Sequence, residues 1–117
     1  MSSNDNILKS PLPLVNDSNI SSFINQFVIT HGKVQNINNN TLTIIVNTQT
    51  NKEILVNNCH KNFEQGIYVK IIGKVAGDQS IEFLDDTVLE NDFDLDLINQ
   101  IVPIWNHKVV APFCYTN

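Results

Sequence analysis

Arginine is absent from this chain of 117 residues, so all seven of its basic side chains are lysines. Twelve acidic residues give a formal net charge of -5. Affinity for nucleic acid comes mainly from cations that neutralise phosphates, and arginine is the side chain best shaped for bidentate phosphate contacts. The composition therefore argues against strong, autonomous binding of DNA or RNA, although it is compatible with a minor contact inside a larger assembly.

Cysteine is scarce too. Cys59 and Cys114 are far apart in the sequence and form no Cys-x-x-Cys motif. We interpret them as reduced thiols of an intracellular protein, and not as a disulfide or a pair of zinc ligands. A chain of this length can bury a hydrophobic core without such crosslinks. We therefore expect one domain that binds no metal ion and no other cofactor.

Long apolar runs are also missing. No segment approaches the roughly 20 apolar residues that a membrane-spanning helix requires. The polar N-terminus lacks the apolar core of a signal peptide. We therefore expect a protein that enters neither the membrane nor the secretory pathway.

Catalytic motifs are missing as well. Asp85 and Asp86 are adjacent, and neighbouring residues of a strand point to opposite faces, which is a poor arrangement for a carboxylate pair. His31, His60 and His107 have no regular spacing. The sequence contains no Gly-rich phosphate loop and no nucleophile elbow. These absences predict that the chain is not an enzyme.

The middle of the chain, from Phe27 to Glu90, shows the alternation and β-branched runs that are typical of strands. We expect five strands, at residues 28–35, 41–46, 52–56, 67–76 and 80–89. The first and fourth are long and contain an internal glycine, which favours the bulge or bend at a barrel corner. The pattern predicts an all-β fold, a five-stranded Greek-key OB-fold barrel followed by a C-terminal α-helix. Another five-stranded barrel or sheet is the alternative.

The boundaries of these parts follow from composition. Residues 1–19 are rich in Ser, Asn and Pro without a sustained period, which predicts a flexible N-terminal arm. Residues 20–91 are expected to form the barrel, and the apolar spacing of Ile20–Phe27 favours a short helix at its start. Residues 92–117 are expected to form an assembly helix and a tail.

The nucleic-acid surface of an OB fold normally has aromatic residues on its second and third strands. The segment Thr41–Val56 contains no Phe, Tyr or Trp, which argues against base stacking there. Weak contacts with phosphates require lysines that share one face of the barrel. The candidates for such a contact are Lys33, Lys52, Lys70 and Lys74. Scattered lysines that only keep the chain soluble are the alternative.

Acidic residues are concentrated between Asp78 and Asp96, a segment that contains eight of the twelve. Such a cluster repels DNA. It either orients a basic surface of a partner or forms a solvated rim.

The C-terminal segment has two apolar rows at helical spacing, after Asp92 or Asp94 as the N-cap. The first row has the 3-4-3-4 spacing of a heptad seam and comprises Leu95, Ile98, Val102, Trp105 and Val109. The second row comprises Leu97, Ile101 and Ile104. A helix that packs on one core needs only one apolar stripe. We therefore expect one row to face the barrel and the other to face a partner; a helix wholly buried in its own domain is the alternative.

Pro103 interrupts this helix pattern. Proline removes one helical hydrogen bond, clashes with the carbonyl four residues back, and costs roughly 3 kcal/mol in a helix interior. The sequence predicts either a kink between Asn99 and Pro103 or a helix broken into two pieces.

Three stretches give this chain a recognisable similarity to a known family. Phe23-Ile24 is followed by Val28–Ile37 (VITHGKVQNI), then by Ile67–Ala76 (IYVKIIGKVA) and Phe93–Trp105 (FDLDLINQIVPIW). In this order and spacing they resemble the small, third subunit of replication protein A, the heterotrimeric eukaryotic binder of single-stranded DNA. The F-D-L-x-L-x-N opening of a terminal helix after the barrel is the most specific of these signals.

The resemblance implies a scaffold role in a nuclear complex for DNA replication, repair and recombination. In that family the C-terminal helix joins helices of the middle and large subunits in a three-helix bundle, and single-stranded DNA is bound mainly through those partners. By position, Leu95, Ile98, Val102 and Trp105 would make this contact, with Val109 continuing the row. Pro103 departs from the family pattern.

Two alternatives to this function remain open. Close relatives serve telomeric or telomerase-associated complexes, so a role in telomere maintenance, or one small subunit shared by both complexes, is the first. An autonomous OB-fold binder of single-stranded nucleic acid is the second. Neither the membrane nor a small-molecule substrate is expected as a partner.

Overall fold

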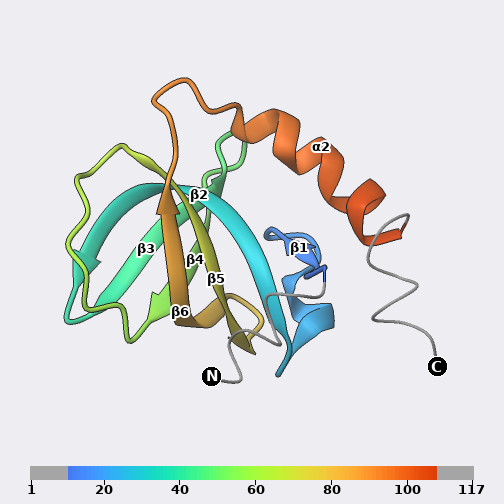
Figure 1. Cartoon of the computed structure of the whole chain (residues 1–117), viewed down its shortest axis with the longest axis horizontal. Coiled ribbons are helices and arrows are strands. Elements are labelled where there is room, and N and C mark those ends of the chain that lie inside the picture. The colour runs from blue at the N-terminus through green and yellow to red at the C-terminus, as the bar shows by residue number, and fades with distance from the viewer. Residues whose placement is uncertain (1–10, 108–117) are drawn as a thin grey trace.

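The computed structural model describes residues 11–107, whose strands form a closed barrel (Figure 1). The barrel strands are β2 (Phe27–Asn38), β3 (Thr41–Asn47), β4 (Lys52–Asn57), β5 (Tyr68–Gly77) and β6 (Ser80–Val88). The sheet order is β1-β2-β3-β4-β6-β5, and pairing of β2 with β5 closes the ring. Only β4 and β6 run parallel within this ring. The predicted five-stranded OB barrel is confirmed.

The barrel forms because each strand alternates between its interior and its surface. Val28, Thr30, Gly32 and Val34 of β2 are buried, whereas the residues that alternate with them, Ile29, His31 and Lys33, are partly exposed. The interior is filled almost entirely by Val, Ile and Leu side chains, which suits the high β-propensity of branched residues.

The predicted bulge at an internal glycine is present in β5. The register between β5 and β6 shifts between Ile72 and Gly73. A Cβ atom at position 73 would collide with the backbone carbonyl oxygen of Glu82 on β6. Glycine therefore allows the two backbones to approach closely where the sheet bends.

The part of the N-terminal segment that the structure describes, from Pro11 onward, belongs to the fold, although its composition predicts a flexible arm. Residues Leu14–Val15 form β1, which pairs in parallel with Ile29 and Thr30 of β2. The Thr30 hydroxyl donates to the Val15 carbonyl at 2.9 Å, and both residues of β1 are buried. This pairing joins residues distant in sequence, so no local period reveals it.

A short 3-10 helix, η1 (Ile20–Phe23), follows β1. Ile20 and Phe23 are 1% and 5% exposed and belong to the hydrophobic core. This helix corresponds to the first half of the predicted one, which the sequence extends to Phe27.

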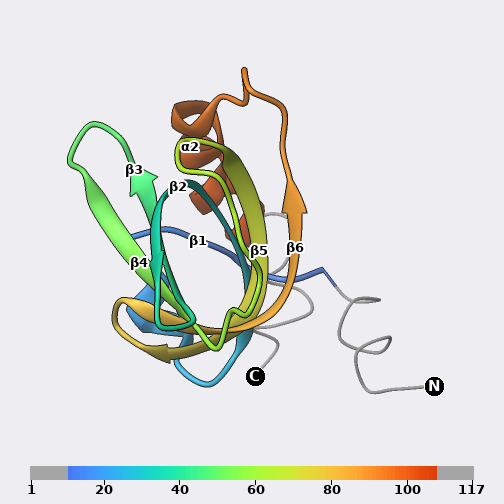
Figure 2. The same ribbon diagram turned by 90° about the vertical axis from the view of Figure 1, so that its left-hand side faces the viewer.

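The C-terminal helix α2 (Leu95–Trp105) lies outside the barrel. The segment that contains β1 runs between its C-terminal half and the barrel wall (Figures 1 and 2). The Asp94 carboxylate accepts the Leu97 N–H at 3.0 Å, as an N-cap should. The helix continues through Pro103 and ends at Trp105, so the broken-helix alternative is not adopted. The predicted row extends to Val109, which lies outside the described residues.

Candidate partner-binding site

Polar side chains fix the C-terminal end of α2 to the N-terminal segment. The Leu14 N–H donates to Asn106 Oδ1 at 2.8 Å, and Asn106 Nδ2 donates to the Leu14 carbonyl at 2.7 Å. At the preceding residue, Trp105 Nε1 donates to the Leu12 carbonyl at 2.8 Å. Because Asn106 is buried, these bonds constrain how the helix is rotated about its axis.

The middle of α2 is attached in the same way. Asn99 Nδ2 donates to the Val46 carbonyl on β3 at 2.8 Å, and Asn99 Oδ1 accepts from Asn16 Nδ2 at 2.9 Å. Nearer the helix start, the Thr48 hydroxyl donates to the Asp96 carboxylate at 3.1 Å. Asn99 thus bridges the barrel and the N-terminal segment.

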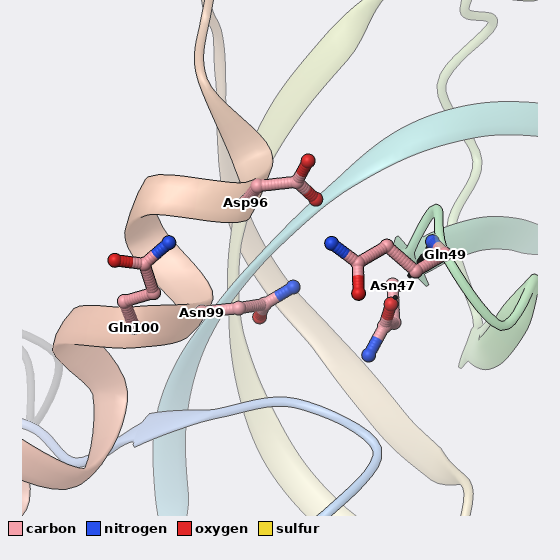
Figure 3. A pocket seen from close by; sticks show the side chains of 5 residues that line it. All are labelled: Asn47, Gln49, Asp96, Asn99 and Gln100. Carbon is pink, nitrogen blue, oxygen red and sulfur yellow. Dashed lines mark hydrogen bonds between the residues drawn. The ribbon is translucent and has the colours of Figure 1, made fainter.

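A polar notch separates this side of α2 from the loop between β3 and β4. Figure 3 shows Asp96 and Asn99 of the helix reaching toward Asn47, at the end of β3, and Gln49 of that loop. Gln100 completes the lining of the notch, whose volume is about 250 Å³. All five residues that line the notch have polar side chains, and two of them, Asp96 and Asn99, attach the helix. The notch is therefore a poor site for an apolar partner.

The face of α2 against the barrel mixes apolar and amide side chains. Leu95 and Val102 are each 3% exposed, and Asn99 and Asn106 lie between and after them at 4-3-4 spacing. The structure therefore places part of the predicted partner row, Leu95 and Val102, against the chain's own barrel. Ile98 and Trp105 of that row lie on one flank of the helix, half-buried.

The second row faces away from the barrel. Leu97 is 50% exposed and Ile104 is 60% exposed. Ile101 lies beside them and is half-buried. We call these three side chains the outer row. Among the described residues they are the apolar side chains of α2 with the most surface free for a partner, together with the flank formed by Ile98 and Trp105.

An apolar groove continues this surface onto the barrel wall. Its helix side is formed by Ile98, Ile101 and Trp105. Its barrel side is formed by Leu14, Ile29, His31 and Lys70. The groove encloses about 320 Å³. The outer row and the groove therefore form one continuous apolar surface, which we call the α2 surface.

Phe93 anchors the start of α2 on the barrel. Its ring stacks on His31 of β2 at a centroid distance of 5.5 Å and lies 5.9 Å from the Tyr68 ring of β5. Burial, with the nearby Lys70 charge, lowers the pKa of His31 to about 4. The imidazole is therefore neutral near pH 7 and joins the apolar wall of the groove.

Three of the four lysines proposed for weak DNA contact share one face. His31 is opposite Lys70, Lys33 is opposite Tyr68, and Phe27 is opposite Lys74 in the β2–β5 ladder. Because residues directly opposite lie on the same side of a sheet, these lysines all project from its outer face. Lys52 starts β4 on a different wall.

The acidic cluster extends from the turn between β5 and β6, along β6 and the connection that follows it, to the first turn of α2. Six of its eight members are exposed: Asp78, Asp85, Glu90, Asp92, Asp94 and Asp96. Asp86 forms an ion pair with Lys61 at 2.6 Å.

Within residues 11–107, no three His, Cys, Asp or Glu side chains are grouped so that they could hold a metal ion. No helix in that part of the chain has the length and apolar character needed to cross a membrane.

Sequence comparison assigns a family to this architecture. The model of the family described as "Replication factor A protein 3" matches residues 8–113. The chain belongs to the replication factor A protein 3 family. Members of this family are non-catalytic small subunits of single-stranded-DNA-binding complexes like replication protein A (RPA), which confirms that the chain is not an enzyme. Among curated proteins, none is similar enough in sequence to count as a relative.

Solved structures share the fold of this family member. A chain of U. maydis replication protein A bound to single-stranded DNA has a TM-score of 0.69 and 24% identity, over 84% of this chain and 94% of that one. A chain of the S. pombe Stn1–Ten1 complex has a TM-score of 0.68 and 15% identity, over 85% and 95%. A chain of yeast RPA bound to single-stranded DNA has a TM-score of 0.63 and 16% identity, over 85% and 95%. At these identities the similarity concerns the fold.

The amide anchors of α2 were not predicted from the sequence. Their signal is nevertheless present, since Asn99 and Asn106 are seven residues apart and so lie on the same helix face as Val102. Asparagine in a helix is usually taken for a solvent-facing residue, which hides such a role. Phe93 belongs to the F-D-L motif, but its stacking on His31 depends on a distant strand.

Proposed function

We propose that this family member is the structural subunit that holds an RPA-like heterotrimer together through the α2 surface. The observation that carries the proposal is the exposure of Leu97 and Ile104, at 50% and 60%, on a helix whose barrel face is already filled. Burial of such side chains contributes about 1.5–3 kcal/mol each. Helices of partner subunits would supply that burial.

The partners that fit this surface are the middle and large OB-fold subunits of the complex. Their helices would pack on the outer row and along the groove, in the three-helix bundle that the family resemblance implies. A stable pair usually buries about 1,200–2,000 Å². Single-stranded DNA would be bound mainly by those subunits, and the complex would work in the nucleus.

Co-expression with tagged middle and large subunits from the same genome tests this function. The variant pair Leu97→Asp and Ile104→Asp should abolish co-purification, because it places two carboxylates in the apolar interface. The matched control is Leu55→Asp with Val88→Asp. These two barrel residues are also apolar and exposed, at 41% and 57%, but lie away from α2. Full co-purification of the α2 variant would refute the proposal.

A telomeric complex is the alternative assembly. Its small subunit would use the same α2 surface, and the S. pombe Stn1–Ten1 chain is as similar in fold as the RPA chains are. The family match favours the RPA-like complex. The two are separated by which large subunit co-purifies with the tagged chain from the native cell.

Weak contact of the chain itself with DNA is proposed for Lys33 and Lys74, on the outer β2–β5 face. Lys70 is on the same face but lines the groove, where a partner helix would cover it. Without arginine or exposed stacking platforms on β3 and β4, the isolated chain should bind single strands only weakly. A fluorescence titration with a labelled oligonucleotide at low salt tests this, because low salt strengthens electrostatic binding. Tight binding would favour the autonomous binder instead.

A further inference from the structure

Among residues 11–107, Lys70 is the one charged side chain that lines the apolar groove. It projects from β5 between His31 of β2 and Thr87 of β6, its opposite neighbours in the two ladders. Within residues 11–107 the only ion pair is Lys61 with Asp86, so Lys70 has no carboxylate within 4.0 Å in that part of the chain. The neighbouring His31 imidazole is either neutral or cationic, so it cannot act as the counterion of Lys70.

A partner that covers the groove therefore has to compensate the positive charge of Lys70. Lys70 is half-buried in the isolated chain, where its ammonium group can still reach water. A purely apolar helix laid along Ile98, Ile101 and Trp105 would remove that water and leave a buried charge without a counterion. Such a complex would be weak, because uncompensated buried charges are strongly unfavourable.

We infer that the helix seated in this groove is an amphipathic helix of a partner subunit that carries an aspartate or glutamate in register with Lys70. The inference rests on the proposed function and specifies the chemistry of its partner. The apolar residues of that helix would contact Ile98, Ile101 and Trp105. Its carboxylate would fix the register of the helix along the groove, in the way that one polar group fixes register in coiled coils.

Lys74 provides a matched control for Lys70. Both lysines lie on β5 and project from the outer face of the β2–β5 ladder, but Lys74 is opposite Phe27 and does not line the groove. Lys70→Glu places two like charges in the interface, whereas Lys74→Glu makes the same change in net charge outside it. Lys70→Met keeps the length of the side chain and removes only its charge.

The experiment measures binding of the full chain to the co-expressed middle and large subunits, by competition with labelled wild-type chain. Lys70→Glu should weaken binding at least about tenfold and Lys70→Met less, while Lys74→Glu stays within about twofold of wild type. Thermal unfolding of each isolated variant shows whether its fold is intact. In addition, replacing the one acidic residue of the partner helix that faces Lys70 by lysine should restore binding of the Lys70→Glu variant, and the same change at its other acidic residues should not.

Three other results would contradict the register carboxylate, and they differ in what they imply for the scaffold function. If Lys70→Glu and Lys70→Met bind as wild type while the Leu97 and Ile104 variant does not, the register carboxylate is refuted and the scaffold function stands. If all these variants bind as wild type, both proposals fail. If Lys70→Glu leaves assembly unchanged but weakens binding of single-stranded DNA by the complex, Lys70 serves the nucleic acid and the inference is overturned.

Discussion

The side-chain amide of Asn106 binds both backbone polar groups of Leu14, 92 residues earlier in the chain. Asn106 Oδ1 accepts from the Leu14 N–H at 2.8 Å, and Asn106 Nδ2 donates to the Leu14 carbonyl at 2.7 Å, as the backbone of a neighbouring strand would. The helix end and β1 are therefore held as one unit. Because this attachment limits rotation of α2, it also determines that Leu97 and Ile104 point away from the barrel.

Removing this amide should loosen the helix. Asn106→Ala leaves the buried Leu14 N–H without its partner, which costs about 1–3 kcal/mol of unfolding free energy. The Leu14 carbonyl keeps the hydrogen bond that Asn19 Nδ2 donates at 3.0 Å. Urea denaturation measures the change. His107→Ala, at the exposed next residue, is the control and should change stability by less than about 0.5 kcal/mol. Equal stability of the two variants would contradict the role of Asn106.

A carboxylate should reduce stability on the barrel face of α2 and reduce assembly on its outer face. Val102→Asp buries an ionisable group against the barrel, so we expect a loss of about 3 kcal/mol or more. Ile104→Asp, in the outer row, should change the unfolding free energy by less than about 0.5 kcal/mol and weaken assembly instead. Denaturation of the isolated chain and co-purification with the partners measure the two effects. Similar destabilisation by both variants would show that α2 is rotated differently.

Stability should fall as the solution becomes mildly acidic. The folded-state pKa of His31 is lowered to about 4, chiefly by burial, from an ordinary value of 6.5. Between pH 4 and pH 6.5 the unfolded chain binds a proton at His31 that the folded chain does not. The contribution of neutral, buried His31 to the free energy of unfolding is therefore complete above pH 6.5 and is lost toward pH 4. The loss is on the order of 2–3 kcal/mol.

Urea denaturation between pH 7.5 and pH 4.5 checks this contribution. Other groups titrate in the same range, so the informative quantity is the difference between wild type and His31→Phe. The phenyl ring keeps the stacking with Phe93 but cannot be protonated. The stability of the His31→Phe variant should depend less on pH than that of wild type. Identical pH dependence of the two proteins would contradict a lowered pKa of His31 in the folded chain.

Pro103 should make α2 less stable than its sequence otherwise allows. Proline cannot donate to the Asn99 carbonyl, and it is roughly 3 kcal/mol less favourable than alanine in a helix interior. Pro103 is exposed and near the helix end, so Pro103→Ala should raise the unfolding free energy by a smaller amount, about 1 kcal/mol. Thermal unfolding measures this, with Gln100→Ala as the control. An unchanged or lower melting temperature would contradict it.

The barrel could be predicted because its signals are local. Alternating residues in Val28–Val34 and the turn at Asn39 and Asn40, both with positive φ, are visible in a short window of sequence. The capped helix after Asp94 is local too. These features identify the elements and their order.

The orientation of α2 could not be predicted, because it depends on groups far apart in the chain. The heptad spacing favours Leu95, Ile98 and Val102 as one face, but hydrogen bonds from Asn99 and Asn106 rotate the buried face toward the amides. β1 was missed for the same reason, since Leu14 and Val15 become a strand only beside β2. Short apolar pairs without a period carry no signal for such pairing.

The most direct test of the α2 surface is the accessibility of its side chains before and after assembly. Leu97→Cys and Ile104→Cys would be introduced with Cys114 replaced by serine, and labelled with a thiol reagent; Cys59 is buried and serves as the unreactive background. Both positions should react quickly in the isolated chain and be protected in the complex, whereas Val88→Cys on the barrel should react in both. Equally fast labelling of positions 97 and 104 in the assembled complex would contradict the claim that partner helices cover this surface.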